Sequence, residues 1–165
     1  MKKITITQIS EKKIKAGNPL LQMEDFPNEL SFDEGELVEL VDSRQKFVAK
    51  AYLAKQNKGV GWVFSLDNAD SFNEAFFKKQ FEKAKRKRTD LQSDPETTTY
   101  RLFNAEGDGI PGVTIDHYDG FAVVSWYSEG IFRYQTAIIA AFQAVFPETK
   151  GIYEKFRYQR KDGLI

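Results

Sequence analysis

The stretch NAEGDGIPGVTID, from Asn104 to Asp116, contains three glycines spaced as G-x-G-x-x-G. This spacing occurs in dinucleotide-binding turns, where a helix follows and its N-terminus faces the pyrophosphate. Here Pro111 and then VTIDHY follow, and the latter alternates β-branched and polar residues as a strand does. Asp108 inside the loop would also repel a phosphate. The stretch therefore predicts a structural turn that leads into a strand, and not a nucleotide site.

The segments around this turn predict a sheet with one helix. TYRLF precedes it as a strand, and VTIDHY and FAVVSWY form a hairpin across Asp119-Gly120, a strong turn signal. IFRYQTAIIAAFQAVF has the wide apolar face of a helix that Pro147 ends, and GIYEKF is typical of one more strand. The order strand, strand, helix, strand leaves the last strand without a sequential partner. We therefore expect residues 97–165 to form a truncated central α+β domain with an exposed sheet edge.

The first 72 residues contain short β-rich runs, ITIT, ELVELVD, KFVAKAYLA and VGWVFSL, separated by polar turns. They predict a small barrel or sandwich over residues 1–72, with no helix except around residues 24–32. Residues 73–96 predict a connector, in which Phe77, Phe81 and Ala84 fall at helical spacing before a polar linker, SDPETTT. The chain has a net charge of 0, yet residues 76–96 carry 7 basic and 4 acidic residues, a net of +3.

The composition narrows the class of protein. With 165 residues, 41% hydrophobic and 29% charged, the chain is typical of soluble globular proteins. No apolar run approaches the ~20 residues that a membrane span needs, so we expect no membrane partner. The absence of cysteine is typical of a cytoplasmic protein, and it excludes thiolate metal ligands. His117 is the only histidine, so we expect no metal site.

The segment RLFNAEGDGIPGVTIDHY resembles the signature of the PUA-containing class I, S-adenosylmethionine-dependent methyltransferases that modify cytosine C5 in large-subunit ribosomal RNA. The resemblance covers the whole chain in order and corresponds to the N-terminal part of that family. It implies a PUA-like RNA-binding barrel at 1–72, a basic connector at 73–96 and a central α+β domain at 97–165. The chain departs from the pattern at Gly17-Asn18-Pro19-Leu20 and at His117, where arginine is common.

The resemblance also implies a function for the chain as a part of a larger enzyme. Family members continue into a Rossmann-like domain with the S-adenosylmethionine site and the catalytic cysteine, which these 165 residues do not contain. C5 methylation usually begins with thiolate attack at C6, and the chain has no cysteine. We therefore expect no catalytic residue and no cofactor in this chain, with S-adenosylmethionine in the parent enzyme. The expected role is to bind ribosomal RNA and position the substrate.

Two groups of residues are candidates for the RNA site. On the connector, clustered positive charge would release counterions on binding RNA, although such a run can also be a solvated helix face. Trp62 could stack on an unpaired base or fill the core of the barrel. The predicted RNA-binding residues are Lys78, Lys79, Lys83, Lys85, Arg86, Lys87, Arg88 and Trp62.

The loop of the signature supplies a second group, which could form the edge of a substrate pocket or serve only to stabilise the turn. Its members are Arg101, Asn104, Glu106 and Asp108. A different class of function is also open, because an exposed sheet edge can pair with another chain. In that alternative the protein is a non-catalytic RNA- or protein-interaction module that forms a homodimer through the edge.

Overall fold

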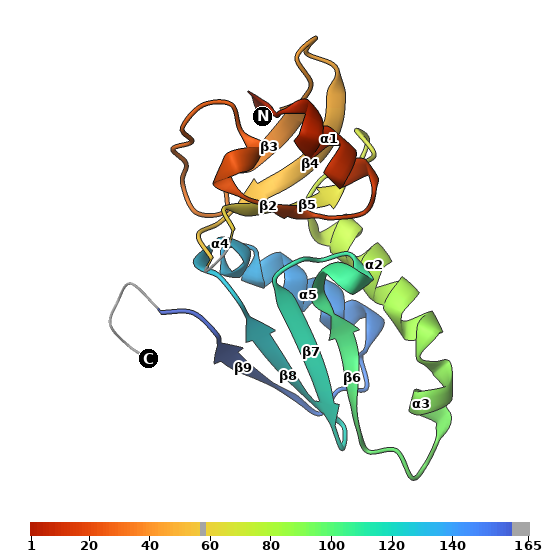
Figure 1. The fold of residues 1–165 in the computed structure, drawn as a ribbon. Coiled ribbons are helices and arrows are strands. Elements are labelled where there is room, and N and C mark those ends of the chain that lie inside the picture. Colours follow the sequence, from red (N-terminus) through yellow and green to blue (C-terminus); the bar gives the residue numbers. More distant parts are fainter. Residues whose placement is uncertain (57–58, 160–165) are drawn as a thin grey trace.

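The computed structural model describes residues 1–56 and 59–159, and these fold into two lobes, each built on its own sheet (Figure 1). The architecture is therefore a two-sheet α+β fold. In chain order the elements are β1 (Lys2–Thr5), α1 (Gln8–Lys15), β2 (Leu20–Leu21), η1 (Met23–Asp25), β3 (Leu37–Val41), β4 (Phe47–Leu53), β5 (Gly61–Ser65), α2 (Glu74–Lys87), α3 (Thr89–Ser93), β6 (Thr99–Asn104), η2 (Ala105–Asp108), β7 (Val113–Tyr118), β8 (Phe121–Trp126), α4 (Glu129–Phe132), α5 (Gln135–Val145) and β9 (Gly151–Phe156).

The N-terminal lobe contains a five-stranded sheet in the order β1-β3-β4-β5-β2. β1 pairs with β3 in parallel and the other neighbours are antiparallel. No pairing between the described strands joins β1 to β2, so the ladder does not close into the expected barrel. The helix α1 was also missed. Thr7 caps it by accepting the Ser10 N–H at 3.1 Å, and the β-like alternation of ITIT conceals this helix start.

The central lobe contains a four-stranded sheet in the order β6-β7-β8-β9, with α2 and α5 on one face (Figure 1). Both helices present aromatic side chains to that face. Phe81 of α2 lies 4.8 Å from Phe103 of β6 and 5.6 Å from Phe142 of α5, measured between ring centroids. The expected connector helix is confirmed, and it begins after Asn73, whose side chain accepts the Phe76 N–H at 3.0 Å.

The expected strand, strand, helix, strand order of the central domain is wrong. β6 is a full member of the sheet, two helices (α4 and α5) replace the single one expected, and β9 has a partner within the chain. β9 pairs in parallel with β8, from Gly151 opposite Phe121 to Phe156 opposite Trp126. A parallel pair needs a crossover connection, which α4 and α5 supply. A hairpin turn in the sequence indicates only antiparallel neighbours. The sequence therefore did not reveal that β8 is the partner of β9.

One hydrophobic cluster spans both lobes, and a second cluster lies within the N-terminal lobe. Tyr52 and Phe72 of the N-terminal part belong to the same buried cluster as Phe77 of α2 and Trp126 of β8. Phe72 lies at the centre of the junction, 5.3 Å from the Tyr52 ring, 4.7 Å from Phe77 and 4.8 Å from Tyr134. Because these rings bury each other across the boundary, separating the lobes would expose aromatic surface to water.

A buried hydrogen bond fixes how the lobes meet. Tyr52 is fully buried, and its hydroxyl donates to the carbonyl of Pro111 at 2.7 Å. The next residue, Gly112, has φ +89°, and a Cβ there would collide with the Tyr52 hydroxyl and approach Ile131 to 3.3 Å. The last glycine of the G-x-G-x-x-G pattern is therefore required for close packing between lobes. The prediction that this stretch is a structural turn is confirmed.

We predict that Gly112→Ala destabilises the protein more than Gly17→Ala does. Both glycines have positive φ, but nothing lies within 4 Å of a Cβ at Gly17. Gly17→Ala should lower the free energy of unfolding by about 1 kcal/mol through backbone strain alone. Gly112→Ala adds overpacking against Tyr52, for a total of about 3 kcal/mol. Urea unfolding of the two variants measures the difference, and equal losses would show that the junction tolerates a side chain at Gly112.

Candidate RNA-binding surfaces and the signature loop

Four of the predicted RNA-binding cations lie on the solvent side of α2. The helix buries Phe76, Phe77, Phe81 and Ala84, which turns its opposite face outward. Lys78, Lys79, Lys83 and Arg86 are exposed on that face. Among the described residues, none of these four side chains forms an ion pair. Their charge is therefore available to an external anion.

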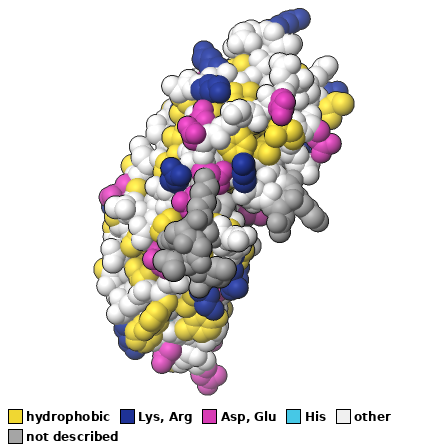
Figure 2. Space-filling view, turned by 90° about the vertical axis from the view of Figure 1, so that its left-hand side faces the viewer, with side chains coloured by type: hydrophobic (Ala, Val, Ile, Leu, Met, Phe, Trp, Pro, Cys, Tyr) yellow, Lys and Arg dark blue, Asp and Glu magenta, His cyan; other side chains and the backbone are white. Residues whose placement is uncertain are grey.

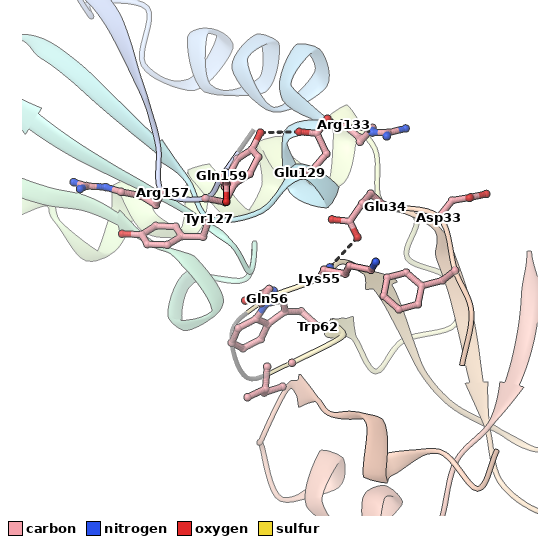
Figure 3. Close-up of a pocket in the computed structure, with 14 residues that line it drawn as sticks. Asp33, Glu34, Lys55, Gln56, Trp62, Tyr127, Glu129, Arg133, Arg157 and Gln159 are labelled. Carbon is pink, nitrogen blue, oxygen red and sulfur yellow. Dashed lines mark hydrogen bonds and ion pairs between the residues drawn. The ribbon is translucent and has the colours of Figure 1, made fainter. Parts of the chain in front are cut away.

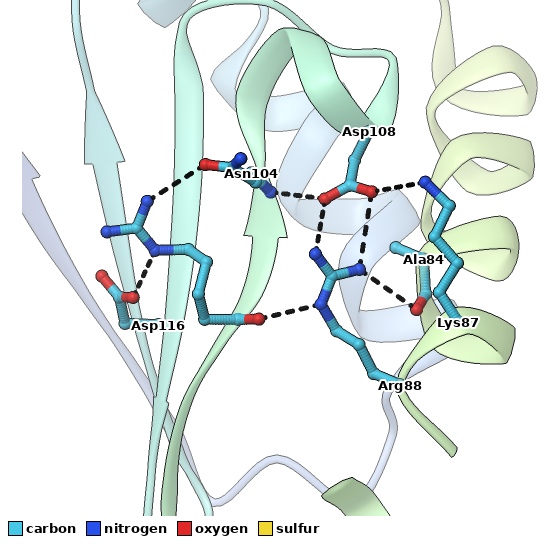
Figure 4. Close-up of polar contacts among 7 residues, drawn as sticks. Ala84, Lys87, Arg88, Asn104, Asp108 and Asp116 are labelled. Carbon is cyan, nitrogen blue, oxygen red and sulfur yellow. Dashed lines mark hydrogen bonds and ion pairs between the residues drawn. The ribbon is translucent and has the colours of Figure 1, made fainter. Parts of the chain in front are cut away.

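The last two cations of the run are held by the signature loop (Figure 4). The carboxylate of Asp108 accepts from Lys87 Nζ at 2.9 Å and from Arg88 Nη2 at 2.8 Å. Its Oδ2 also accepts the Asn104 N–H at 2.7 Å, and Arg88 Nε donates to the Arg101 carbonyl at 2.8 Å. Asp108 thus joins the end of α2 to the turn between β6 and β7, which is a structural use of these charges.

The environment of Asp108 favours its ionised form. Burial by itself would raise the pKa of the Asp108 carboxyl, since its side chain is only 4% exposed. The hydrogen bonds from Arg88, Lys87 and the Asn104 N–H outweigh burial and hold that pKa below its usual range. The carboxylate therefore remains ionised at neutral pH and is neutralised inside the protein.

Lys85 also has partners within the chain. Its Nζ donates to the carbonyl of Val145 at 2.8 Å and lies 5.3 Å from the centroid of the Phe146 ring. Lys85 therefore caps the C-terminal end of α5, where a cation interacts favourably with carbonyls that lack a partner within the helix. Of the seven predicted cations, three serve contacts inside the protein and four do not.

None of the predicted pocket-edge residues lines the two cavities described for residues 1–56 and 59–159, and three of the four bond to one another or to their neighbours. Arg101 Nε donates to Asp116 Oδ1 at 2.5 Å, and its Nη1 donates to Asn104 Oδ1 at 3.3 Å. These contacts lie on the sheet, whereas Asp108 faces α2 (Figure 4). Glu106 is exposed beside them. Arg101 and Asn104 lie in β6, whereas Glu106 and Asp108 lie in η2, and the directions of these side chains depend on their tertiary partners.

A cleft of about 890 Å³ lies between the lobes (Figure 3). Trp62 of β5 lines it from the N-terminal side, and Tyr127, which follows β8, lines it from the central side. Trp62 is half-buried, and its buried indole Nε1 has no hydrogen-bond partner among residues 1–56 and 59–159. The prediction that Trp62 faces a ligand is therefore compatible with its position, since one part of the ring borders open space.

Among the described residues that line the cleft, acidic and basic side chains are equal in number. Lys55, Arg133 and Arg157 line it together with Asp33, Glu34 and Glu129. Two of the acids have partners, because Glu34 accepts the Lys55 N–H at 2.8 Å and Glu129 accepts the Tyr158 hydroxyl at 2.9 Å. Figure 2 shows side chains of both signs at the waist of the molecule beside apolar ones. Such a cleft favours a polar, uncharged group over a phosphate.

No pattern in the sequence indicated that Tyr127, Arg133 and Arg157 line a cleft. They belong to no motif, and they reach Trp62 only because the shared core brings the lobes together. In the described residues, no group of three or more histidine, cysteine, aspartate or glutamate side chains could hold a metal ion. No described helix has the length and apolar character that crossing a membrane requires.

Comparison with known proteins identifies relatives of the chain. Residues 4–66 match the PUA-like domain family. The chain is 40% identical over 160 residues to a Bacillus subtilis (strain 168) protein named "Putative ribosomal RNA large subunit methyltransferase YwbD", covering 96% of this chain and 40% of that one. It is 32% identical over 132 residues to "Ribosomal RNA large subunit methyltransferase I" of Cronobacter sakazakii, covering 79% of this chain and 33% of that one. The chain is homologous to large-subunit ribosomal RNA methyltransferases.

Solved structures share the two-sheet unit. A protein described as "A putative sam-dependent methyltransferase from Streptococcus mutans" superposes with a TM-score of 0.90 and 42% identity, over 96% of this chain and 42% of that one. A second structure, described as "SMU.776, a putative methyltransferase complexed with SAH", superposes equally well, with a TM-score of 0.90 and 43% identity over 95% of this chain and 40% of that one. The chain thus spans about 40% of the length of these structures and 33–40% of the two relatives.

These structures correct the expected fold class. The sequence predicted a PUA-like small barrel, a connector helix and an incomplete central domain. The two-sheet α+β unit is instead shared with the S-adenosylmethionine-dependent methyltransferases along almost the whole chain. The sequence did not reveal that the Tyr52–Pro111 contact and a cluster of buried side chains join the two sheets.

We predict that Asp108→Asn lowers the free energy of unfolding at pH 7 by about 3 kcal/mol, because it leaves buried cationic hydrogen bonds without their anion. Glu106→Gln in the same loop is the matched control and should cost under about 0.5 kcal/mol, since Glu106 is exposed.

The effect should also depend on pH. Asp108 has a lowered folded-state pKa, so its contribution is complete above the unfolded-state value of about 4 and is lost as pH falls through the folded-state value. Wild type and Asp108→Asn should therefore converge in stability below about pH 4. A difference that stays constant from pH 7 to pH 3 would contradict the role of this carboxylate.

Proposed function

We propose that this two-sheet unit binds and positions ribosomal RNA for methylation of a cytosine at C5, and that it does not transfer the methyl group by itself. One observation carries the proposal. Four exposed cations lie on one face of α2 without ion-pair partners among the described residues, in a chain homologous to large-subunit ribosomal RNA methyltransferases.

The α2 cations suit the RNA backbone. Lys78, Lys79, Lys83 and Arg86 are long, mobile side chains that can follow phosphates without reading sequence. Glu82 is the acid that shares their part of the helix, so the face keeps a positive excess. Phosphates bound there would release counterions, which gives affinity that falls steeply with salt. Lys85, Lys87 and Arg88 contribute to the local potential but are already bonded within the protein.

The cleft suits a nucleobase better than a phosphate. Trp62 offers an aromatic surface, and the surrounding charges cancel. A base is uncharged and can stack on an aromatic side chain while its edges form hydrogen bonds. We therefore assign Trp62 the role of contacting an unpaired base and α2 the role of holding the backbone. The PUA-like domain at residues 4–66 supplies Trp62.

Methyl transfer requires chemistry that these residues do not supply. S-adenosylmethionine is the methyl donor in the proposed reaction. C5 of the base usually becomes nucleophilic only after a thiolate has added to C6. The 165 residues contain no cysteine. We expect the chain alone, incubated with S-adenosylmethionine and ribosomal RNA, to give no methylated cytosine above a control without protein. Methylated product would contradict the assignment of a positioning role.

We predict that replacing Lys78, Lys79, Lys83 and Arg86 together by glutamine weakens RNA binding and flattens its salt dependence. With about 0.7 counterions released per phosphate contact, the slope of log affinity against log salt should change by roughly 3. Fluorescence anisotropy with a labelled fragment of large-subunit ribosomal RNA, titrated at several salt concentrations, measures the slope.

A charge-matched variant controls for net charge. Lys2, Lys12, Arg44 and Lys46 are exposed on the N-terminal lobe, and their replacement by glutamine removes the same four charges. That variant should keep a slope close to wild type. Equal slopes for wild type and the α2 variant would place the phosphate contacts elsewhere, and no binding by wild type would remove the proposed function.

A second candidate function is self-association through β9. This strand is the last in the order of the central sheet, and within the described residues it pairs only with β8. Unpaired N–H and C=O groups on an edge can add a strand from a second copy. If a homodimer forms in this way, sedimentation equilibrium should show a mass that rises with concentration. A constant monomer mass would exclude it.

A further inference from the structure

The face of the central sheet opposite α2 and α5 has its own set of side chains. On the helix side, Glu154 of β9 accepts from Trp126 Nε1 at 3.1 Å and from Gln135 of α5 at 3.0 Å. Because side chains alternate along a strand, Tyr153 and Lys155 point to the other face. The same alternation places Tyr118 and Phe121 there. In Figure 1 the described helices of this lobe lie behind the sheet, and no helix covers this open face.

Aromatic rings form a row on the open face. Tyr118 lies opposite Phe121 in the hairpin, and Phe121 lies opposite Gly151. The Phe121 ring extends over Gly151, where a Cβ would approach it to 3.2 Å, and its centroid is 6.1 Å from that of Tyr153. Three neighbouring strands thus each contribute one ring. The absence of a side chain at Gly151 lets the rings approach one another.

Two of these rings are unusually exposed. Tyr153 is 62% exposed and Tyr118 46%, while Phe121 between them is half-buried. Of the other large hydrophobic side chains that are exposed in the described chain, Tyr127 lines the cleft and the rest are aliphatic. Exposed aromatic rings gathered on one face indicate a surface that recognises a partner.

The charge of this face indicates an anionic partner. Arg101 of β6 and Lys155 of β9 lie on this face, and Asp116 of β7 lies opposite Arg101. Asp116 is bonded to Arg101, so the remaining excess is positive. Lys150 adds a cation 5.8 Å from the centroid of Phe121. Flat rings and cations together match the bases and phosphates of a nucleic acid strand.

We propose that the open face of the β6–β9 sheet is a stacking surface for an unpaired RNA segment. Bases in a duplex are stacked on each other and cannot lie on tyrosine rings, whereas unpaired bases can. The row Tyr118, Phe121 and Tyr153 receives the bases, while Lys155 and Lys150 approach the phosphates. The inference rests on the proposed RNA-binding function, and it adds a surface separate from α2, which covers the opposite face.

The test uses the full chain and a labelled, unstructured single-stranded RNA of about 12 nucleotides, long enough to span such a site. The same RNA annealed to its complement is the second probe. Tyr118→Ala with Tyr153→Ala removes two rings, Tyr118→Phe with Tyr153→Phe retains them, and Leu66→Ala with Leu91→Ala is a control on exposed aliphatic residues. Circular dichroism and urea unfolding check that each variant is folded.

The alanine pair should weaken binding of the single strand on the order of tenfold or more, because stacking contributes about 1–3 kcal/mol per base. The phenylalanine pair and the leucine control should bind as wild type does, and duplex binding should change little. Unchanged single-strand affinity in a folded alanine pair would overturn the proposal. So would an alanine pair that alters only self-association, which would assign the face to a second copy.

The outcomes separate this inference from the proposed function. If the glutamine variant of α2 loses RNA affinity while the alanine pair does not, RNA binding stands and the stacking surface fails. If wild type binds neither probe nor a ribosomal RNA fragment, the proposed function and the inference both fail.

Discussion

The structure depends on one buried hydrogen bond between lobes, from the Tyr52 hydroxyl to the Pro111 carbonyl. A buried hydroxyl without a partner would be costly, so the position of the signature loop is tied to strand β4. Burial also raises the pKa of Tyr52 well above its usual range, which keeps the hydroxyl protonated as a donor at neutral pH. Gly112 permits this approach because it has no side chain, and Phe72 completes the junction. The cleft beside Trp62 exists because this junction holds both walls.

The distribution of charge on α2 follows from the same loop. A run of basic residues in a sequence predicts one continuous basic surface. Here, however, Asp108 forms ion pairs with Lys87 and Arg88 and holds them against the turn. Val145 holds Lys85 in a similar way. The face left for an anion is therefore smaller than the sequence indicates, and it is shifted toward Lys78, Lys79, Lys83 and Arg86. In the proposed function, the G-x-G-x-x-G loop therefore has an indirect role, which is to organise the end of the helix.

Much of the fold could be predicted where neighbours in the chain decide it. The hairpin across Asp119-Gly120, the helix with buried Phe77 and Phe81, and the turn at Pro111 all follow from local patterns. The pairing of β9 with β8 could not be predicted, since a parallel partner is chosen by the crossover helices. The helix α1 was missed because only Ile14 and Ser10 are buried in it, which leaves little apolar periodicity. The cleft could not be predicted either, because the residues that line its two walls are far apart in the sequence.

The central claim is that the two lobes form one cooperative unit, and the two tryptophans allow a direct test. Trp62 lies in the N-terminal lobe and Trp126 in the central lobe. Urea unfolding of the variants Trp62→Phe and Trp126→Phe, each followed by its remaining tryptophan and by circular dichroism, reports each lobe separately. A shared core predicts that fluorescence and circular dichroism give the same midpoint within each variant. Fluorescence of one lobe that changes at a distinctly lower urea concentration than circular dichroism would contradict the account.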